Sequence, residues 1–397
     1  MNTPAYAGGT PVRNTPIGYG HQYIDDADIE AVVSVLKSDY LTCGPEIEKF
    51  EKKLCDITGA KYAVAVSNGT AALHIACMAA GVKPGDEVIT TPITFAASAN
   101  CALYCGAKPV FADINPETYN IDPDEVIAKT TSKTKAVVAV DYTGQSVELD
   151  RLLAHCRANN ITLIEDGAHV IGTKYNGQPN GSIADMTTFS FHPVKTVTSG
   201  EGGAVTTNSK ELYEKLLLYR SHGITRKQEL MTKESEGPWY YQMIDLGYNY
   251  RMTDIQAALA SSQLDKLPMF SARRKEIVKK YDEAFSKIPS IFVQKEIPES
   301  DTTRHLYILR IVPEKLKIDR LEFFKALAAE NIFCNVHYIP VYRLPYYENL
   351  GYPEGLCPNA EKLYSEMLTL PLFYSMSDED VESVIKAVTR IAEYYAI

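Results

Sequence analysis

The chain has 397 residues, of which 45% are hydrophobic and 23% charged, a balance typical of a soluble globular protein with two or three domains. The formal net charge is −10 and no basic block is present, which argues against nucleic acid as a partner. The first 20 residues lack an apolar signal core, and no run approaches ~18 apolar residues, so we expect no membrane span. Eight scattered cysteines predict free thiols in a reducing, cytoplasmic compartment, and Cys101 and Cys105 lack the further ligands that a metal site needs.

The first half of the chain alternates between strand and helix patterns. Residues 1–25 are rich in Gly, Pro and Thr and predict an irregular N-terminal arm. Helices are expected at 25–37, 45–58, 71–81 and 148–158, with a further helix between residue 91 and about residue 105. Strands are expected at 62–66, 87–91, 109–113, 135–140 and 161–165. This alternation predicts an α/β fold whose mostly parallel sheet is covered by helices on both faces. Ligands of such folds bind at the carboxyl ends of the strands.

The pattern changes in the second half. Short β segments are expected within 183–207, followed by helices at 209–220 and 253–266. Beyond about residue 268 the chain predicts a long charged helix at 270–287, strands within 305–312, and helices at 319–330 and 377–394. We therefore expect a large domain over 26–267 and a smaller α+β domain over 268–397.

The stretch SNGTAAL, residues 67–73, follows an expected strand and opens an expected helix. A glycine turn at this place exposes backbone N–H groups at the helix N-terminus, where the helix dipole attracts an anion such as phosphate. A helix N-cap made by Ser, Asn or Thr gives the same pattern, so the motif alone leaves both interpretations open.

The stretch IEDGAH, residues 164–169, places Asp166 at the end of an expected buried strand. A buried carboxylate is costly unless it meets a cation or a hydrogen-bond donor, and a protonated ring nitrogen would satisfy it. A helix cap or an internal salt bridge is the alternative interpretation.

Lys195 stands in the loop FHPVKTVTSGEGGAV, residues 191–205, whose Pro and Gly residues restrict the backbone. A lysine in a partly desolvated pocket loses proton affinity and becomes a nucleophile that can form a Schiff base. Ser190, just before the loop, carries a hydroxyl that can bind phosphate. An exposed lysine and a serine at a strand edge are the alternatives.

A phosphate cradle, a buried Asp and a loop lysine, in this order on an α/β sheet, are what pyridoxal 5′-phosphate (PLP) requires. The lysine holds the aldehyde, the Asp keeps the pyridine nitrogen protonated, and the glycine turn holds the phosphate. Phe95 and His169 are placed to stack on the two faces of the cofactor ring, although each is also a common packing residue. The combination predicts a PLP site with Lys195 as its catalytic residue.

The chain resembles the sugar aminotransferases of the DegT/DnrJ/EryC1/StrS family, which are fold type I PLP-dependent transferases. The resemblance covers nearly the whole chain and rests on the ordered motifs GGTPVR, LTCGPEIEKFE, VSNGTAALH, PGDEVITTPITFAASAN, KPVFADI, EDGAHVIG, FSFHPVKTVTSGEGGAV and LGYNYRMTDIQAALA. The segments SFHPVK, RSHGITR, GPWYYQ, GYNYRMTDIQAAL and NVHYIPVY look most like the pseudaminic acid branch of the family. The resemblance implies a mixed, mostly parallel sheet sandwiched by helices and a smaller C-terminal α+β domain.

The resemblance also implies roles for individual residues. The residues expected to bind PLP are Asn68, Gly69, Thr70, Phe95, Asp166, His169, Ser190, Lys195 and Asn249. Asn249 would reach the cofactor phosphate across a homodimer interface, so that each site needs two chains, whereas on the residues alone it is a turn residue. The residues expected to line the nucleotide-sugar pocket are Tyr19, Asp39, Tyr40, Leu41, Thr42, Asn68, Ser190, Asn249, Asn335, Val336, His337 and Tyr338. Without the resemblance, His337 and Tyr338 are better explained by packing.

Two positions depart from the family pattern. Cys43 stands in LTCGP where relatives often have Gln, close to the expected sugar site. His169 replaces a Gln seen in many relatives, although His is common in the pseudaminic acid branch. Neither change affects the expected chemistry, but Cys43 leaves the choice of sugar open.

The function implied by the resemblance is transamination, with L-glutamate as the amino donor, 2-oxoglutarate as its product and the C4 ketone of a UDP-linked 4-keto-6-deoxy-N-acetylhexosamine as the acceptor. The same reaction on another nucleotide-linked 4-keto sugar, of the perosamine or bacillosamine type, is an alternative. A sugar dehydrase on this fold lacks the Schiff-base lysine, so Lys195 argues against that activity. A non-catalytic regulator that binds PLP or a nucleotide sugar usually carries a DNA-binding segment, and no basic helix-turn-helix is evident.

Overall fold

A seven-stranded sheet forms the centre of the molecule, which is described over residues 3–397 by a computed structural model. Its strand order is β2-β10-β9-β6-β5-β3-β4. The strands are β2 (Tyr62–Val66), β3 (Glu87–Thr90), β4 (Lys108–Phe111), β5 (Thr134–Val140), β6 (Thr162–Asp166), β9 (Met186–Ser190) and β10 (Gly203–Thr207). β10 runs antiparallel to β2 and β9, whereas the other neighbouring pairs are parallel. The predicted mixed, mostly parallel sheet is therefore confirmed.

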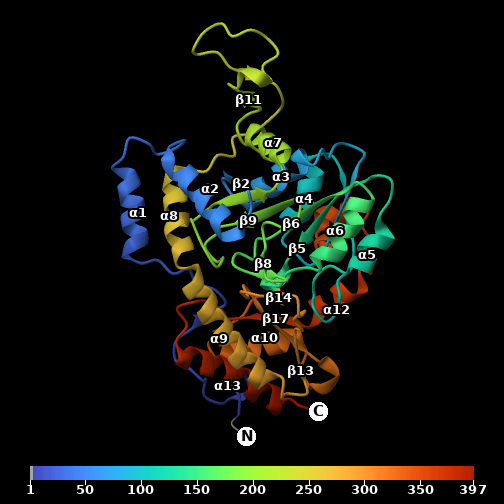
Figure 1. Cartoon of the computed structure of the whole chain (residues 1–397). Helices are drawn as coiled ribbons and strands as arrows, with labels where there is room; N and C mark the ends of the chain where they lie inside the picture. Colours follow the sequence, from blue (N-terminus) through green and yellow to red (C-terminus); the bar gives the residue numbers. More distant parts are fainter. Residues whose placement is uncertain (1–2) are drawn as a thin grey trace.

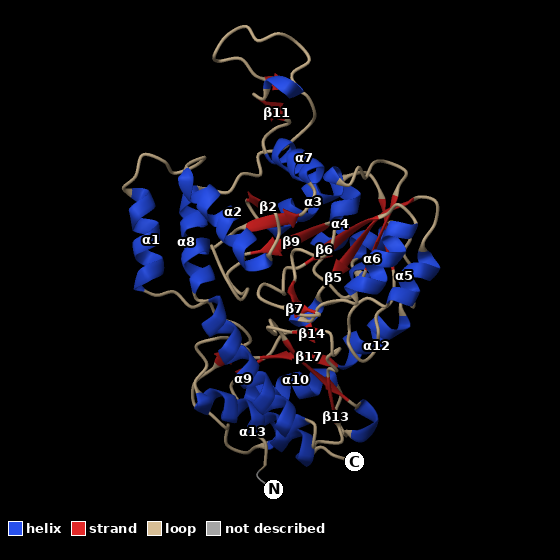
Figure 2. Ribbon diagram, viewed as in Figure 1, coloured by secondary structure: helices blue, strands red, loops and turns tan. Residues whose placement is uncertain are grey.

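Helices cover both faces of this sheet (Figure 2). One face is packed by α3 (Gly69–Ala79), α4 (Ala97–Tyr104) and α7 (Lys210–Arg220). The other face is packed by α2 (Pro45–Thr58), α5 (Pro123–Lys129), α6 (Leu149–Ala158) and α8 (Asp254–Asp265), with α1 (Asp26–Leu36) lying outside α8 (Figure 1). Side chains alternate along a strand, so Val64 and Val66 pack with α3 whereas Ala63 and Ala65 pack with α2. A strand buried on both faces must be apolar throughout, which explains the sequence YAVAV.

A second layer of structure lies below the sheet in Figure 1 and is reached through α9 (Leu267–Phe285). Its three-stranded antiparallel sheet consists of β13 (Ile291–Val293), β15 (Tyr307–Ile311) and β17 (Met367–Leu370), and its other helices are α10 (Arg320–Ala329) and α13 (Asp378–Tyr394). The inner faces of α9, α10 and α13 share one apolar core with these strands. The predicted domain boundary near residue 268 coincides with the start of α9, and the division into an arm, a large domain and a small domain stays a prediction.

The N-terminal arm and the C-terminal segment both make contacts that the sequence did not indicate. In the N-terminal arm, β1 (Ile17–Gly18) pairs with β16 (Ile332–Phe333), and the buried Glu330 accepts hydrogen bonds from the backbone N–H groups of Ala5 and Val12. The arm is thus attached to the C-terminal part of the chain. Conversely, Tyr342 and Tyr347 pack against Phe111 of β4, so part of the C-terminal segment lies against the large sheet.

The regular elements that were not predicted include α5, α12 (Pro358–Glu366), β13 and β17. α5 has only seven residues, too few to show a helical period, although Asp122 caps it and proline opens it. β17 follows α12 without an intervening turn residue, so no local signal separates the two.

A hairpin made by β11 (Ile224–Thr225) and β12 (Gln242–Met243) projects from the top of the molecule in Figure 1. It carries the exposed side chains of Trp239 and Tyr241. The remaining short elements are η1 (Ala5–Ala7), η2 (Tyr142–Gly144), β7 (Lys174–Tyr175), β8 (Gln178–Pro179), η3 (Gln228–Leu230), β14 (Ser300–Asp301), η4 (Pro313–Lys315), η5 (Val341–Arg343) and α11 (Pro345–Asn349). Within residues 3–397, none of the helices combines the length and the apolar composition needed to cross a bilayer.

Candidate active site

A cavity of about 710 Å³ lies where β2, β6 and β9 end. The predicted site residues that line it are Tyr19, Asn68, Gly69, Thr70, Phe95, Asp166, His169, Ser190, Lys195, His337 and Tyr338. The carboxyl ends of these strands meet at one edge of the sheet, so residues distant in sequence converge there. The structure thus brings together most of the residues predicted to bind cofactor or substrate.

Lys195 lies in the loop between β9 and β10, which is closed by its own hydrogen bonds. The backbone N–H of Phe191 donates to Gly202 O over 2.9 Å, and that of Ser199 donates to Phe191 O over 2.9 Å. Lys195 is half-buried: it lines the cavity, but protein atoms surround most of its side chain. Burial therefore lowers the pKa of Lys195 to about 8, against the opposing attraction of Asp166. An amine with this pKa is available both as a nucleophile and as a proton carrier near neutral pH.

Asp166 is held in a fixed orientation at the bottom of the cavity. Ser98 Oγ donates to Asp166 Oδ2 over 2.6 Å, and the backbone N–H of Ala168 donates to Oδ1 over 3.3 Å. Thr94 Oγ1 in turn lies 2.8 Å from Ser98 Oγ. Burial raises the pKa of Asp166, while Ser98 and Lys195 act in the opposite direction. A protonated ring nitrogen beside the carboxylate would favour its charged form further.

The N-terminus of α3 provides the predicted anion cradle. Asn68 Oδ1 accepts the N–H of Ala71 over 2.8 Å, so Asn68 does act as an N-cap. The N–H groups of Gly69 and Thr70 donate to no other group among residues 3–397 and are free for an anion. A Cβ on Gly69 would lie 2.9 Å from Ser190 Cβ, so only glycine permits this close approach. The N-cap interpretation of SNGTAAL is therefore confirmed, and the anion site stays a prediction that this geometry permits.

Aromatic and imidazole rings form the walls of the cavity. The side chain of Phe95 is 64% exposed, so its ring is accessible for stacking. His169 is buried, and burial, with Lys195 and His337 adding to it, holds its pKa well below the usual value. Burial likewise lowers the pKa of His337 to about 4, and its Nδ1 lies 3.0 Å from Thr369 Oγ1. Both imidazoles are therefore neutral at neutral pH.

Some of the predicted site residues do not line this cavity: Asp39, Tyr40, Leu41, Thr42, Asn249, Asn335 and Val336. Asn249 and the segment 39–42 are exposed on the single chain. The structure of one chain therefore leaves their roles as predictions.

Ser98 and His305 are among the cavity residues that the sequence analysis missed. Ser98 stands in TPITFAASAN, three residues after Phe95, and this spacing on one helical turn was a usable signal. His305 lies in the C-terminal half, and nothing near it in sequence relates it to the site.

The arrangement fits PLP. The chain offers an amine with a lowered pKa, a buried carboxylate whose one cationic neighbour among residues 3–397 is Lys195, and free N–H groups in a cradle that a Cβ would fill. In the part of the chain that the structure describes, no three His, Cys, Asp or Glu side chains are grouped so that they could hold a metal ion.

The family model for the DegT/DnrJ/EryC1/StrS aminotransferase family matches residues 22–389. The chain belongs to the DegT/DnrJ/EryC1/StrS aminotransferase family. Among its relatives, the spore coat polysaccharide biosynthesis protein SpsC of Bacillus subtilis is 42% identical, over 96% of this chain and 98% of SpsC. The UDP-4-amino-4,6-dideoxy-N-acetyl-beta-L-altrosamine transaminase of Campylobacter jejuni strain 81-176 is 39% identical, over 95% of this chain and 98% of that protein.

Solved structures agree with this assignment. The PLP form of the putative sugar aminotransferase Spr1654 from Streptococcus pneumoniae superposes with a TM-score of 0.88 at 34% identity, covering 96% of this chain and 99% of that chain. The protein is therefore a fold type I, PLP-dependent sugar aminotransferase, as predicted. The alternatives of a sugar dehydrase and of a non-catalytic regulator do not apply.

Proposed function

We propose that this aminotransferase moves the amino group of L-glutamate to C4 of UDP-2-acetamido-2,6-dideoxy-β-L-arabino-hexos-4-ulose. The product would be UDP-4-amino-4,6-dideoxy-N-acetyl-β-L-altrosamine, as in pseudaminic acid biosynthesis. The observation that carries the proposal is the 39% identity, over 95% of the chain, to the Campylobacter transaminase named for this product. The segments around Lys195, Asn249 and His337 that resemble the pseudaminic acid branch support it.

PLP, when bound, supplies an aldehyde that accepts an amino group and a ring that withdraws electrons from the reacting carbon. Asp166, oriented by Ser98, binds the pyridine nitrogen and keeps it protonated. The N–H groups of Gly69 and Thr70, with Ser190, bind the phosphate. Phe95 and His169 restrict the tilt of the ring.

Lys195 holds the cofactor at rest and moves protons during turnover. Its Nζ, once free, would take a proton from the carbon that bears the glutamate amine and later give that proton up again, with PLP supplying the electron-withdrawing ring. The sugar half-reaction reverses this movement, so one group acts first as base and then as acid. The pKa of Lys195, about 8, suits both directions near neutral pH.

The sugar is expected to lie against Tyr19, His337 and Tyr338 on the C-terminal side of the cavity. The rings of Tyr19 and His337 lie with their centroids 4.9 Å apart, and the lowered pKa of His337 keeps that imidazole neutral. A neutral wall suits an uncharged sugar ring, while the UDP group supplies binding energy that positions the C4 ketone.

A panel of substrates tests the proposal. The purified holoenzyme is incubated with L-glutamate and one UDP-linked 4-keto-6-deoxy sugar at a time, and the amino sugar and 2-oxoglutarate are measured. We expect the β-L-arabino 4-ketone to give the highest kcat/KM. A clear preference for a perosamine-type or bacillosamine-type precursor would contradict the proposed substrate while leaving the transaminase assignment intact.

The same transamination on another nucleotide-linked 4-keto-6-deoxy sugar is the second candidate function. SpsC, whose name places it in spore coat polysaccharide biosynthesis, is 42% identical, slightly more than the altrosamine transaminase. Cys43, where relatives often have Gln, is also exposed, and it lies next to the predicted sugar-binding segment 39–42. The substrate panel separates the two candidates.

The site is proposed to be shared between two chains, with Asn249 of one chain reaching the phosphate held by the other. Asn249 is exposed on the single chain and lies next to Tyr250, which lines the cavity edge. Asn249→Ala is therefore expected to weaken PLP retention.

Mixing Lys195→Ala and Asn249→Ala chains tests this arrangement, at a PLP concentration low enough to leave Asn249→Ala alone without cofactor and therefore inactive. If sites are shared, a hybrid of Lys195→Ala and Asn249→Ala chains contains one site with both native residues, so an equal mixture should recover about a quarter of wild-type activity. A mixture that stays as inactive as its two components would refute a site shared through Asn249. Unmixed samples of each variant are the controls.

We expect the protein to act in the cytoplasm. All eight cysteines are free thiols, and four of them are fully buried. Free thiols are typical of reducing compartments.

A further inference from the structure

Two buried histidines meet at the bottom of the cavity. The ring centroids of His169 and His305 lie 4.5 Å apart with an angle of 40° between the ring planes. Both side chains are 5% exposed, and both line the cavity. Among residues 3–397, neither Nδ1 atom has a hydrogen-bond partner. His169 is therefore held in place by packing, and the His305 ring is its nearest flat neighbour.

The backbone of His305 is fixed from both sides. Its N–H donates to Thr143 O over 2.7 Å, and its carbonyl accepts a hydrogen bond from Arg274 Nη1 over 3.1 Å. The same guanidinium also donates to Leu372 O over 3.0 Å, which ties the segment to the stretch that follows β17. A histidine anchored in this way has little freedom to move its ring.

Gly144 allows the two histidine segments to approach each other. A Cβ at this position would lie 2.8 Å from the backbone N of His305 and 3.0 Å from the carbonyl O of His169. Gly144 also has a φ of +99°, which disfavours any side chain. Three segments distant in sequence therefore meet at one glycine, whose near neighbours are the backbones of both histidines.

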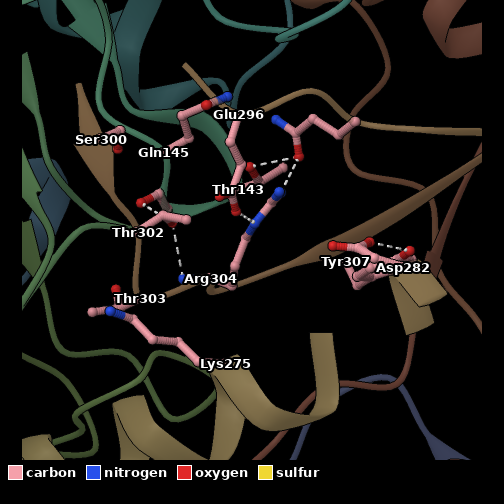
Figure 3. Close-up of polar contacts among 12 residues, drawn as sticks. Thr143, Gln145, Lys275, Asp282, Glu296, Ser300, Thr302, Thr303, Arg304 and Tyr307 are labelled. Carbon is pink, nitrogen blue, oxygen red and sulfur yellow. Dashed lines mark hydrogen bonds and ion pairs between the residues drawn. The ribbon is translucent and has the colours of Figure 1, made fainter. Parts of the chain in front are cut away.

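Arg304 completes the support. It has a φ of +48°, an unfavourable value for a side chain of this size, and its guanidinium is bound at two points (Figure 3). Nε donates to Glu296 Oε1 over 2.8 Å and Nη1 donates to Gln294 Oε1 over 2.5 Å. Gln294 Oε1 also accepts a hydrogen bond from Thr143 Oγ1, so Arg304 is tied to the same residue that binds the backbone of His305. The turn that delivers His305 is thereby kept in one conformation.

We propose that His305 is a positioning residue, whose ring packs against His169 and fixes the orientation of that imidazole at the cofactor. The proposal rests on the proposed role of His169 beside PLP. His305 itself forms no bond in the reaction and acts through the flat surface that it offers. Its Nδ1 is buried and has no partner in the described part of the chain, so shape rather than hydrogen bonding is the property used.

The charged groups around the pair explain why both rings must be neutral. Burial holds the pKa of His305 well below its usual value, with contributions from His169, Lys195, Arg274 and His337. A second charge so close to Lys195 would oppose protonation of its amine. Two neutral rings support the cofactor without disturbing the group that moves protons.

The first test uses the protein without cofactor and requires no turnover. His169 is observed by imidazole NMR, with His169→Gln identifying its signals. We expect one sharp, non-titrating neutral ring in the wild type, and broadened or titrating His169 signals in His305→Ala. His305→Phe, which restores a flat ring, should restore a single sharp form. Unchanged His169 signals in His305→Ala would overturn the proposal, whatever the enzyme's substrate proves to be.

The second test uses the holoenzyme and L-glutamate. His305→Ala is expected to shift the visible absorption band of the cofactor and to slow the glutamate half-reaction about 10-fold to 100-fold, the cost of a small misplacement. The glutamate concentration for half-saturation should change little, and His305→Phe should stay within about 3-fold of wild type. Equal losses in His305→Ala and His305→Phe would show that a ring nitrogen is needed, which contradicts a role through packing.

A matched control separates positioning from general destabilisation. Tyr307 lies two residues further along, is also buried, and donates to Asp282 Oδ1 over 2.8 Å outside the cavity (Figure 3). Tyr307→Leu should lower the unfolding temperature without changing the band or the half-reaction rate of the folded enzyme. If His305→Ala does not fold, His305→Val is used in its place. A normal cofactor absorption band and a normal half-reaction rate in that variant would overturn the proposal.

Discussion

Lys195→Ala is expected to lower turnover by about 10⁴-fold, because one amine serves both as the attachment point of PLP and as the proton carrier. Among the lining residues that the structure describes, no second lysine is present. His169 and His305 are held neutral by burial, and Asp166 accepts a hydrogen bond from Ser98. Single-turnover kinetics with L-glutamate measure the loss, and Lys83→Ala, at an exposed lysine, is the control. A Lys195→Ala variant with near-normal turnover would contradict the account.

The same substitution should not unfold the protein. The pKa of Lys195 is lowered by burial from 10.5 to about 8, so between these values the unfolded chain binds the proton and the folded chain does not. The stability of the cofactor-free protein should therefore rise with pH from about 8 to 10.5, because the buried charge opposes folding at lower pH. Lys195→Ala removes that cost, and thermal unfolding of the cofactor-free variant should show equal or greater stability at pH 7.

Asp166→Asn is expected to have the second largest effect, a loss of about 10³-fold in kcat with weaker cofactor binding. An amide matches the shape of the carboxylate but carries no charge, so it does not keep the pyridine nitrogen protonated. Without that proton the ring withdraws electrons poorly from the reacting carbon. The rate of the glutamate half-reaction and the dissociation constant of PLP are the quantities to measure.

Ser98→Ala is the graded control for this prediction. It removes the 2.6 Å hydrogen bond to Asp166 but leaves the carboxylate in place, so the loss should be only about 10-fold. If Asp166→Asn and Ser98→Ala had the same small effect, Asp166 would be a structural carboxylate rather than the partner of the ring nitrogen.

Much of the fold and the bottom of the site followed from local sequence signals. The strand and helix alternation predicted the sheet. Asp166 and the SNGTAAL turn were recognised because they stand at the ends of expected strands, and Ser190 because it lies beside the loop that carries Lys195. Their convergence depends on β2, β6 and β9 ending at one edge of the sheet. Strand order is set by long-range pairing. Sequence patterns therefore predicted which side chains belong to the site but not the distances between them.

The remaining parts of the site depend on contacts between distant segments. His305 reaches the cavity only because Gly144 allows three segments to meet, and no local pattern encodes that approach. Ser98 had a usable signal, since it lies one helical turn from Phe95. Asn249 and the segment 39–42 are exposed on one chain, so their proposed roles depend on a second copy of the protein.

An absorption titration of the purified holoenzyme tests the central claim most directly. L-glutamate is added first, then a UDP-linked 4-keto-6-deoxy sugar, while the visible band of the bound cofactor is followed. We predict that glutamate removes the band of the wild-type protein, that the keto sugar restores it, and that Lys195→Ala shows neither change at a comparable rate. A band that fails to respond to glutamate, or a Lys195→Ala variant that cycles like the wild type, would contradict transamination through Lys195.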